Sequence, residues 1–266
     1  MAATEGGFHT LKAPIYDFSG QVVLVTGASS GMGLATAIAF AQAGAKVALA
    51  DVKITAVEVI VAELVSAGHR AIAVGCDVSD DAQVSAMVER TVAEFGGPDV
   101  AFNNAGVMAQ VALTADSTRE EWDRVTGINL RGVWNYMRYE LRQMQRQGGG
   151  AIVNNASVGA LTGNPGIGAY IASKHGVVGL TQTAALEYVG HGIRINAVNP
   201  GVVDTQIARD VVKGDDQAYA EMVKQVPIRR AGRPEEIASA VLWLCSPGAS
   251  YVIGQAITID GGMTVP

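Results

Sequence analysis

From Gln21 onward, short runs of apolar and β-branched residues alternate with segments whose apolar residues recur at helical spacing. Such alternation is typical of βαβ units, in which each helix crosses over a parallel sheet. The pattern therefore predicts an α/β fold. The predicted strands are Val22–Val25, Lys46–Ala50, Ala71–Gly75, Val100–Asn103, Ala151–Asn154, Arg194–Val198 and Ala256–Ile259.

Helix boundaries are marked by glycine, proline and capping residues. Two intervening segments carry one apolar face each and stop at Gly68 and Gly96. Thr118, followed three residues later by Glu121, fits a capping box. Pro234, followed by two glutamates, suits the first turn of a helix. We expect long helices to begin near both points.

The size and composition of the chain favour one domain. Its 266 residues are 49% hydrophobic and 17% charged, enough to bury a single large core. We expect an N-terminal extension over residues 1–16 and one domain over residues 17–266. Residues 201–226 show no clear period and are predicted to be a substrate loop. No apolar stretch suits a signal peptide or a membrane span, which predicts a soluble, cytoplasmic protein.

Charge and cysteine content exclude several function classes. A net charge of −6 and the absence of Lys or Arg runs argue against nucleic acid and anionic membranes as partners. Cys76 and Cys245 lie far apart in apolar stretches, which favours buried free thiols over a disulfide or a metal pair. The four histidines are scattered, so we expect no metal site.

Residues 26–33, Thr-Gly-Ala-Ser-Ser-Gly-Met-Gly, follow the first predicted strand and precede a helical segment. A glycine-rich turn in this position lets backbone N–H groups approach phosphates, and the helix N-terminus adds partial positive charge. The glycine spacing departs from the common Gly-x-Gly-x-x-Gly pattern. A tight turn without a ligand is the alternative interpretation.

Asp51 ends the second predicted strand, 24 residues after Gly27. This is close to where an acidic side chain reaches the adenosine ribose of a bound dinucleotide, although a helix N-cap is the alternative. A carboxylate there would accept the ribose hydroxyls of NAD and repel the 2′-phosphate of NADP. Because Lys53 is the only nearby cation in the sequence, NAD is favoured over NADP.

Tyr170 and Lys174 lie four residues apart, on one face of a predicted helix, and Ser157 follows a predicted strand. A tyrosine with an ordinary pKa of about 10 must lose roughly 3 units, or about 4 kcal/mol, to act as a base near neutral pH. A positive charge 4 Å away supplies about 4 kcal/mol at an effective dielectric of 20, but only about 1 kcal/mol in water. The trio therefore predicts an acid–base site in a dehydrated cleft. Ordinary surface side chains are the alternative.

From Gln21 to about Gly262 the chain resembles the short-chain dehydrogenase/reductase family. The resemblance implies a single Rossmann-like, doubly wound sheet of about seven parallel strands in three αβα layers, serving as the dinucleotide-binding and catalytic domain. The matching strings are Thr26–Gly33, Asn103-Asn104-Ala105-Gly106, Asn129, Ser157, Tyr170-x-x-x-Lys174, Pro200-Gly201 and Asp260-Gly261-Gly262.

The same resemblance implies roles for further residues. Asn129 is expected to bend its helix and bind a water leading to Lys174, with a plain polar helix residue as the alternative. Asp77 and Val78 are expected at the adenine, with a helix cap as the alternative for Asp77, and Thr205 at the nicotinamide carboxamide. The complete predicted cofactor site is Gly27, Ser29, Ser30, Gly31, Met32, Gly33, Asp51, Asp77, Val78, Asn104, Ala105, Gly106, Tyr170, Lys174, Pro200, Gly201, Val203 and Thr205.

These observations predict an NAD(H)-dependent oxidoreductase that interconverts a secondary alcohol and a ketone, with Asn129, Ser157, Tyr170 and Lys174 as catalytic residues. The alternatives are an NADPH-dependent 3-oxoacyl-[acyl-carrier-protein] reductase and a dinucleotide-binding regulatory module without turnover. Small and apolar residues after Ser157 and Gly201 favour a mainly apolar substrate.

A homotetramer or homodimer is expected. Gly176 and Gly179 lie inside the helix that carries Tyr170, where each costs roughly 1 kcal/mol, so a second helix is expected to approach them closely. The neighbouring helix is predicted to offer apolar area to a second subunit through Trp134, Tyr136, Met137 and Leu141.

Overall fold

The structure, a computed structural model, describes residues 14–265; the predicted N-terminal extension lies almost entirely outside the described residues. Seven parallel strands form one sheet in the order β3-β2-β1-β4-β5-β6-β7. All seven predicted strands are present, and the predicted Rossmann-like sheet is confirmed. The strands are β1 Val22–Thr26, β2 Lys46–Asp51, β3 Arg70–Gly75, β4 Val100–Asn103, β5 Gly150–Asn155, β6 Ile193–Pro200 and β7 Ala256–Ile259.

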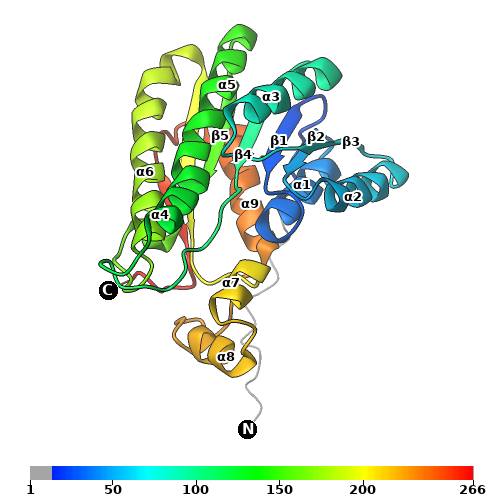
Figure 1. Cartoon of the computed structure of the whole chain (residues 1–266). Helices are drawn as coiled ribbons and strands as arrows, with labels where there is room; N and C mark the ends of the chain where they lie inside the picture. The colour runs from blue at the N-terminus through cyan, green and yellow to red at the C-terminus, as the bar shows by residue number, and fades with distance from the viewer. Residues whose placement is uncertain (1–13, 266) are drawn as a thin grey trace.

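Helices cover both faces of the sheet and give three layers (Figure 1). Helices α3, α5 and α6 pack on one face, and α1, α2 and α9 pack on the other. The helices are α1 Gly31–Gln42, α2 Ile54–Ser66, α3 Asp81–Phe95, α4 Arg119–Thr126, α5 Gly132–Gln147, α6 Gly168–Tyr188, α7 Gln206–Val211, α8 Asp216–Lys224 and α9 Pro234–Cys245, with a π-helical turn, η1 Gly127–Arg131, and 3₁₀ turns at Val158–Ala160 (η2), Val189–His191 (η3) and Pro247–Ala249 (η4).

The sheet separates two apolar cores because successive residues of a strand point to opposite faces. In β1, Leu24 joins the core formed with α3, α5 and α6, whereas Val23 and Val25 join the core formed with α1 and α9. All five residues of β1 are buried. This two-sided burial explains why the strands appear in the sequence as continuous apolar runs.

The direction of strand order reverses between β1 and β4, the two central strands. Ligands of doubly wound folds bind at the carboxyl ends of the strands beside such a switch point. The segments that follow β1, β4 and β5 meet there, and α7 and α8 project from the same end of the sheet (Figure 1). The fold thus gathers the predicted site residues at one edge.

The segment predicted as a substrate loop, residues 201–226, contains the two short helices α7 and α8. Thr205 caps α7 by accepting a hydrogen bond from the N–H of Ala208, and Asp215 caps α8 by accepting from the N–H of Gln217. These helices have only 6 and 9 residues. At that length an apolar period does not show in the sequence, so these two helices were not predicted, while the role of the segment as a substrate loop stays a prediction.

The two predicted helix starts differ in detail. Thr118 caps α4 by accepting from the N–H of Glu121, but the Glu121 carboxylate turns to other partners, so the reciprocal half of the capping box is absent. Pro234 is the first residue of α9, as predicted, and the Glu236 side chain accepts from the N–H of Arg233 there. The other half of a capping box is absent, because an arginine side chain has no acceptor.

Two predicted contributions to a subunit interface are corrected. Tyr136, Met137 and Leu141 are buried in the chain's own core, and only Trp134, 46% exposed, lies on the surface. The close approach at Gly176 is made within the chain, since a Cβ there would lie 2.7 Å from the Leu130 Cδ1 atom.

A buried polar cluster lies between α5 and the sheet. The Asn103 side chain donates to Glu140 Oε2 at 3.0 Å and to Asn154 Oδ1 at 2.9 Å, and Asn154 donates to Thr181 Oγ1 at 2.9 Å. Glu140 has no exposed area, and its Oε1 has no partner among the described residues. Burial raises the pKa of Glu140 to about 7.

Replacement of Glu140 by Gln should make stability less dependent on pH. Between about pH 4.5 and pH 7 the folded chain holds a proton on Glu140 that the unfolded chain releases, so the wild-type free energy of unfolding falls as pH rises through this window. The difference between Glu140→Gln and wild type should therefore move in favour of the variant by roughly 3 kcal/mol from pH 4.5 to 8. Urea unfolding across this range measures it; a constant difference would contradict the raised pKa.

Candidate active site

The turn after β1 brings backbone, without side chains, to the edge of the sheet. Gly27 and Gly31 have positive φ angles of 63° and 55°, which favour glycine. A Cβ on Gly27 would lie 2.9 Å from Asn104 Nδ2, and a Cβ on Gly33 would clash with the Gly27 carbonyl oxygen. Helix α1 begins at Gly31 within this turn, and the first N–H groups of a helix have no acceptor inside the helix. The turn therefore fits a diphosphate.

Asp51, at the end of β2, faces this turn. Its Oδ2 accepts from the N–H of Ser29 at 3.0 Å and its Oδ1 from the N–H of Lys53 at 2.9 Å. It does not cap a helix, because α2 follows Lys53 and has no side-chain cap. Each carboxylate oxygen can accept a second hydrogen bond, which leaves Asp51 able to bind ribose hydroxyls.

Asn104 joins the turn to the end of β4. Thr26 Oγ1 accepts from the N–H groups of Asn104 and Ala105 at 3.0 and 3.1 Å, and Asn104 Nδ2 donates to the carbonyls of Thr26 and Gly27 at 3.0 and 3.2 Å. Asn155, which the sequence analysis missed, donates to Asn104 Oδ1 at 2.9 Å. The signal for it was a second asparagine at the end of a buried strand.

Lys174, Tyr170 and Ser157 come together next to this network. Lys174 is 4% exposed, donates to the Asn155 carbonyl at 2.7 Å, and its Nζ lies 5.6 Å from the centre of the Tyr170 ring. A Cβ on Gly159 would lie 3.4 Å from Ser157 Oγ and 3.5 Å from Tyr170 Cε1, so these two side chains adjoin. The fold thus brings the side chains of Ser157, Tyr170 and Lys174 close together, as their pattern in the sequence predicted.

Burial dominates the electrostatics of this site. It raises the pKa of Tyr170, and the neighbouring Ser157 hydroxyl only partly opposes this. It also lowers the pKa of Lys174 to about 8. The expectation that Lys174 brings the tyrosine toward neutral pH is therefore not met by the chain alone, since removal of both groups from water disfavours both charges.

Asn129 lies in the π-helical turn η1, between α4 and α5, where the helix type changes; its expected role stays a prediction. Its Oδ1 accepts from the N–H of Val107 and its Nδ2 donates to the Val107 carbonyl, both at 2.8 Å. A Cβ on Gly106 would lie 3.2 Å from Asn129 Oδ1 and 3.7 Å from Lys174 Nζ. Gly106 therefore lies between the side chains of Asn129 and Lys174.

Asp77 and Val78 follow β3, an edge strand of the sheet, whereas Ser157 follows β5. Asp77 accepts from the N–H and hydroxyl of Ser79 at 2.9 and 2.7 Å. Asp80, rather than Asp77, caps α3, so the helix-cap alternative for Asp77 is wrong. The side chain of Val78 is buried in the core, which leaves its backbone as the part nearest the edge.

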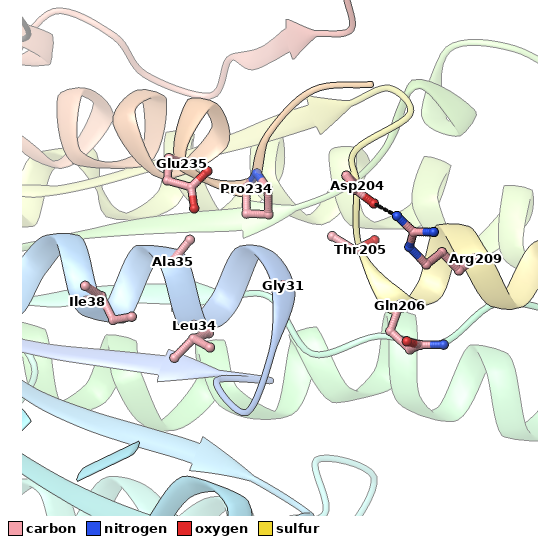
Figure 2. Close-up of a pocket in the computed structure, with 10 residues that line it drawn as sticks. All are labelled: Gly31, Leu34, Ala35, Ile38, Asp204, Thr205, Gln206, Arg209, Pro234 and Glu235. Carbon is pink, nitrogen blue, oxygen red and sulfur yellow. Dashed lines mark hydrogen bonds and ion pairs between the residues drawn. The ribbon is translucent and has the colours of Figure 1, made fainter. Parts of the chain in front are cut away.

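The segment after β6 closes the other side of the turn. A Cβ on Gly31 would lie 3.1 Å from Thr205 Cγ2, and a cavity of about 400 Å³ opens beside these two residues, between α1, α7 and the start of α9 (Figure 2). Gly201, next to Pro200, packs against Asp260, and Val203 forms a parallel bridge with Gly232. Thr205 therefore lies next to the glycine turn that follows β1.

The remaining candidates do not join the site. Cys76 and Cys245 are free and buried. His175 bonds the Ile171 carbonyl of its own helix. Across residues 14–265 no group of three or more His, Cys, Asp or Glu is arranged to hold a metal ion. Nor does any helix within that range have the length and apolar character needed to cross a membrane.

The fold and the turn beside its switch point define a dinucleotide-binding protein of the doubly wound class. Comparison with known proteins agrees. A family model described as enoyl-(acyl carrier protein) reductase matches residues 27–264. Cyclohexanol dehydrogenase from Acinetobacter sp. (strain SE19) is 42% identical over 247 residues, which cover 93% of this chain and 96% of that protein.

Two further relatives match over most of their length. Levodione reductase from Leifsonia aquatica is 41% identical over 260 residues, 95% of this chain and 97% of that one. A crystal structure of levodione reductase has a TM-score of 0.89 and 42% identity, covering 92% of this chain and 98% of the other. The 3-oxoacyl-[acyl-carrier-protein] reductase FabG from Thermotoga maritima is 40% identical over 246 residues, 92% of this chain and 98% of that protein.

This chain belongs to the short-chain dehydrogenase/reductase family of oxidoreductases, whose members bind a nicotinamide dinucleotide.

Proposed function

We propose that the protein is an NAD(H)-dependent oxidoreductase that interconverts a secondary alcohol and a ketone. The observation that carries the proposal is the convergence of Ser157, Tyr170 and Lys174 beside Gly106, at the edge that also presents the phosphate turn. Relatives at about 40% identity are named for the oxidation of cyclohexanol and the reduction of levodione, which supports a cyclic alcohol or ketone as substrate.

The residues around the edge fit the parts of a dinucleotide. The bare turn formed by Gly27, Ser29, Ser30, Gly31, Met32 and Gly33 would hold the diphosphate, and Asp51 the adenosine ribose. Asp77 and Val78 would contact the adenine. The nicotinamide half would lie along Asn104, Ala105, Gly106, Pro200, Gly201, Val203 and Thr205. When bound, NAD⁺ supplies the acceptor for a hydride from the alcohol carbon.

Tyr170 would take the proton of the substrate hydroxyl during oxidation and return it during reduction. Ser157, 9% exposed, would hold the substrate oxygen. Because burial raises the pKa of Tyr170, its phenolate needs positive charge nearby, and Lys174 is the chain's own source. Asn129 would position a water through which Lys174 exchanges protons with solvent.

The substrate side of the site is apolar. Ala160 and Val203 are buried, while Leu161 is 49% exposed near Ser157 and Val202 is half-buried after β6. A mainly hydrophobic alcohol or ketone suits these surroundings better than a charged one. The small helices α7 and α8 would cover it.

The second candidate is an NADPH-dependent 3-oxoacyl-[acyl-carrier-protein] reductase, which the 40% identity to FabG favours. Asp51 argues against it, because a carboxylate held by two backbone N–H groups at the ribose position would face the 2′-phosphate as a like charge. The intact Ser157, Tyr170 and Lys174 argue against a regulatory module without turnover.

A homotetramer or homodimer remains our proposal for the assembly. A groove of about 820 Å³ runs between η1, α5 and α6, and its lining includes Leu130, Trp134, Gly179 and Leu180. Gly179 has open space around it and Trp134 is half-exposed, so a second subunit has apolar area to cover.

Replacement of Tyr170 by Phe tests the reaction. The wild type should form NADH from NAD⁺ and cyclohexanol, and Tyr170→Phe should lose at least about tenfold in kcat because the group that takes the proton is gone. Its Kd for NAD⁺, measured by fluorescence titration, should stay within about threefold of wild type. Retention of more than about a tenth of wild-type kcat would remove Tyr170 from the mechanism.

Replacement of Asp51 by Ser tests cofactor choice. The wild type should prefer NAD⁺ over NADP⁺ in kcat/KM, and the variant should lower this ratio at least about tenfold, since a lost like-charge repulsion of about 1.4 kcal/mol corresponds to that factor. Initial rates with the two cofactors in parallel measure it. A wild type that prefers NADP⁺ would favour the second candidate instead.

A further inference from the structure

A segment without regular structure, residues 107–117, crosses the site between β4 and α4; we name it the strap. It begins after Gly106, beside Lys174. Farther along, the N–H of Ala112 donates to the Gly166 carbonyl at 2.9 Å, and Val111 Cγ1 would lie 3.0 Å from a Cβ on Gly166. Gly166 stands four residues before Tyr170. The strap thus runs from a residue beside Lys174 to the segment that precedes Tyr170 in the chain.

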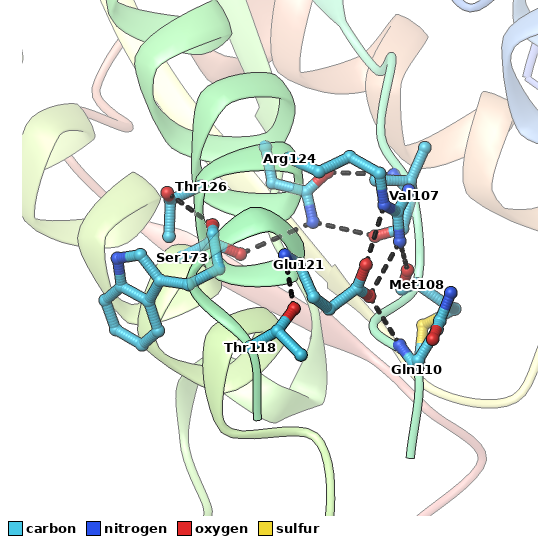
Figure 3. Close-up of polar contacts among 10 residues, drawn as sticks. Val107, Met108, Gln110, Thr118, Glu121, Arg124, Thr126 and Ser173 are labelled. Carbon is cyan, nitrogen blue, oxygen red and sulfur yellow. Dashed lines mark hydrogen bonds and ion pairs between the residues drawn. The ribbon is translucent and has the colours of Figure 1, made fainter. Parts of the chain in front are cut away.

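Two side chains of α4 hold the backbone of the strap (Figure 3). Glu121 Oε1 accepts from the N–H of Gln110 at 2.6 Å, and Arg124 Nη2 donates to the Met108 carbonyl at 2.8 Å. Glu121 and Arg124 also bind each other through two hydrogen bonds of 2.9 and 2.8 Å. The Glu121 side chain is only 11% exposed.

This pair does more than bridge two neighbouring turns of a helix. An exposed ion pair at i,i+3 contributes only a few tenths of a kcal/mol. Here both partners also bind a strap that has no secondary structure of its own to fix its path. Because Gln110 is exposed, its N–H can bind water if Glu121 is lost. Loss of the pair should therefore change the position of the strap more than the stability of the fold.

The strap presents apolar side chains to the outside. Val111, which adjoins Gly166, and Leu113 are 76% and 68% exposed. Large apolar side chains left exposed beside a site form a surface that a ligand can cover. On the proposed function, a ring-containing alcohol held at Ser157 would extend farther toward this surface than a short-chain alcohol.

We propose that Glu121 and Arg124 are specificity-determining positioning residues, which fix the strap so that Val111 and Leu113 form the outer wall for a ring-containing secondary alcohol. The proposal rests on the proposed function, because it assigns the wall of the same site. Neither residue touches the reacting atoms, and both act through the backbone of the strap.

The test compares Glu121→Ala with Glu120→Ala. Glu120 occupies the same first turn of α4, is exposed and makes no polar side-chain contact among the described residues, so its loss removes the same helix charge without touching the strap. Glu121→Gln keeps an acceptor for the Gln110 N–H but loses the ion pair. The readouts are hydrogen exchange of residues 107–117, kcat/KM for cyclohexanol and for 2-propanol, and Kd for NAD⁺.

Glu121→Ala should speed exchange in the strap and lower the ratio of kcat/KM for cyclohexanol to that for 2-propanol by at least about fivefold. Its Kd for NAD⁺ should stay within about threefold of wild type, Glu121→Gln should lie between, and Glu120→Ala should match wild type.

Three results would overturn the proposal: Glu121→Ala and Glu120→Ala giving the same exchange and the same ratio, faster exchange with an unchanged ratio, or a rise in Kd for NAD⁺ as large as the loss toward cyclohexanol. Failure of the proposed function is recognised separately, because the wild type would then oxidise neither alcohol. The exchange measurement needs no substrate, so even in that case it shows whether Glu121 and Arg124 fix the position of the strap.

Discussion

The burial of Lys174 against the end of β5 is the constraint on which the proposed chemistry depends. Its ammonium has one protein partner among the contacts of the structure, the Asn155 carbonyl, and burial lowers its pKa to about 8. The same burial raises the pKa of Tyr170. A dry cleft strengthens the attraction between a cation and a phenolate, but it first penalises both charges. In the protein without cofactor, the penalty for burying the two charges is larger than the attraction between them.

The predicted cofactor site and the predicted acid–base site lie at one edge of the sheet, and hydrogen bonds connect them. The Asn104 side chain binds the carbonyls of Thr26 and Gly27 and accepts from Asn155, whose backbone holds Lys174. One hydrogen-bonded path therefore connects the glycine turn after β1 to Lys174 across the three adjacent strands β1, β4 and β5. A bound oxidised cofactor would bring its positive charge to the place where Tyr170 needs it, so the tyrosine would become a base when the complex forms.

The sequence predicted the parts of the molecule that depend on local pattern. Strands buried on both faces appear in the sequence as apolar runs. The glycines after the first run predicted the tight turn between β1 and α1. Contacts between distant segments were not predictable. The residues around Asn155 in the sequence do not indicate that Asn104 is its hydrogen-bond partner. The sequence predicted Glu121 as half of a capping box, whereas its carboxylate accepts from the N–H of Gln110 in the strap. Apolar residues such as Tyr136 can face the core of the chain or a second subunit, and the sequence does not distinguish the two. In the structure the side chain of Tyr136 is buried in the core.

The direction of the Tyr170 pKa was missed for the same reason, because a loss of solvent depends on everything packed around the ring. The pKa of Tyr170 therefore tests the proposed acid–base chemistry most directly. NMR of ring-labelled tyrosine measures this pKa, and the Tyr170→Phe variant identifies the signal. In the free protein the pKa should lie above its ordinary value of about 10, and saturating NAD⁺ should lower it by at least about 1 unit. A pKa that is already below 10 without cofactor, or that NAD⁺ leaves unchanged, would contradict it.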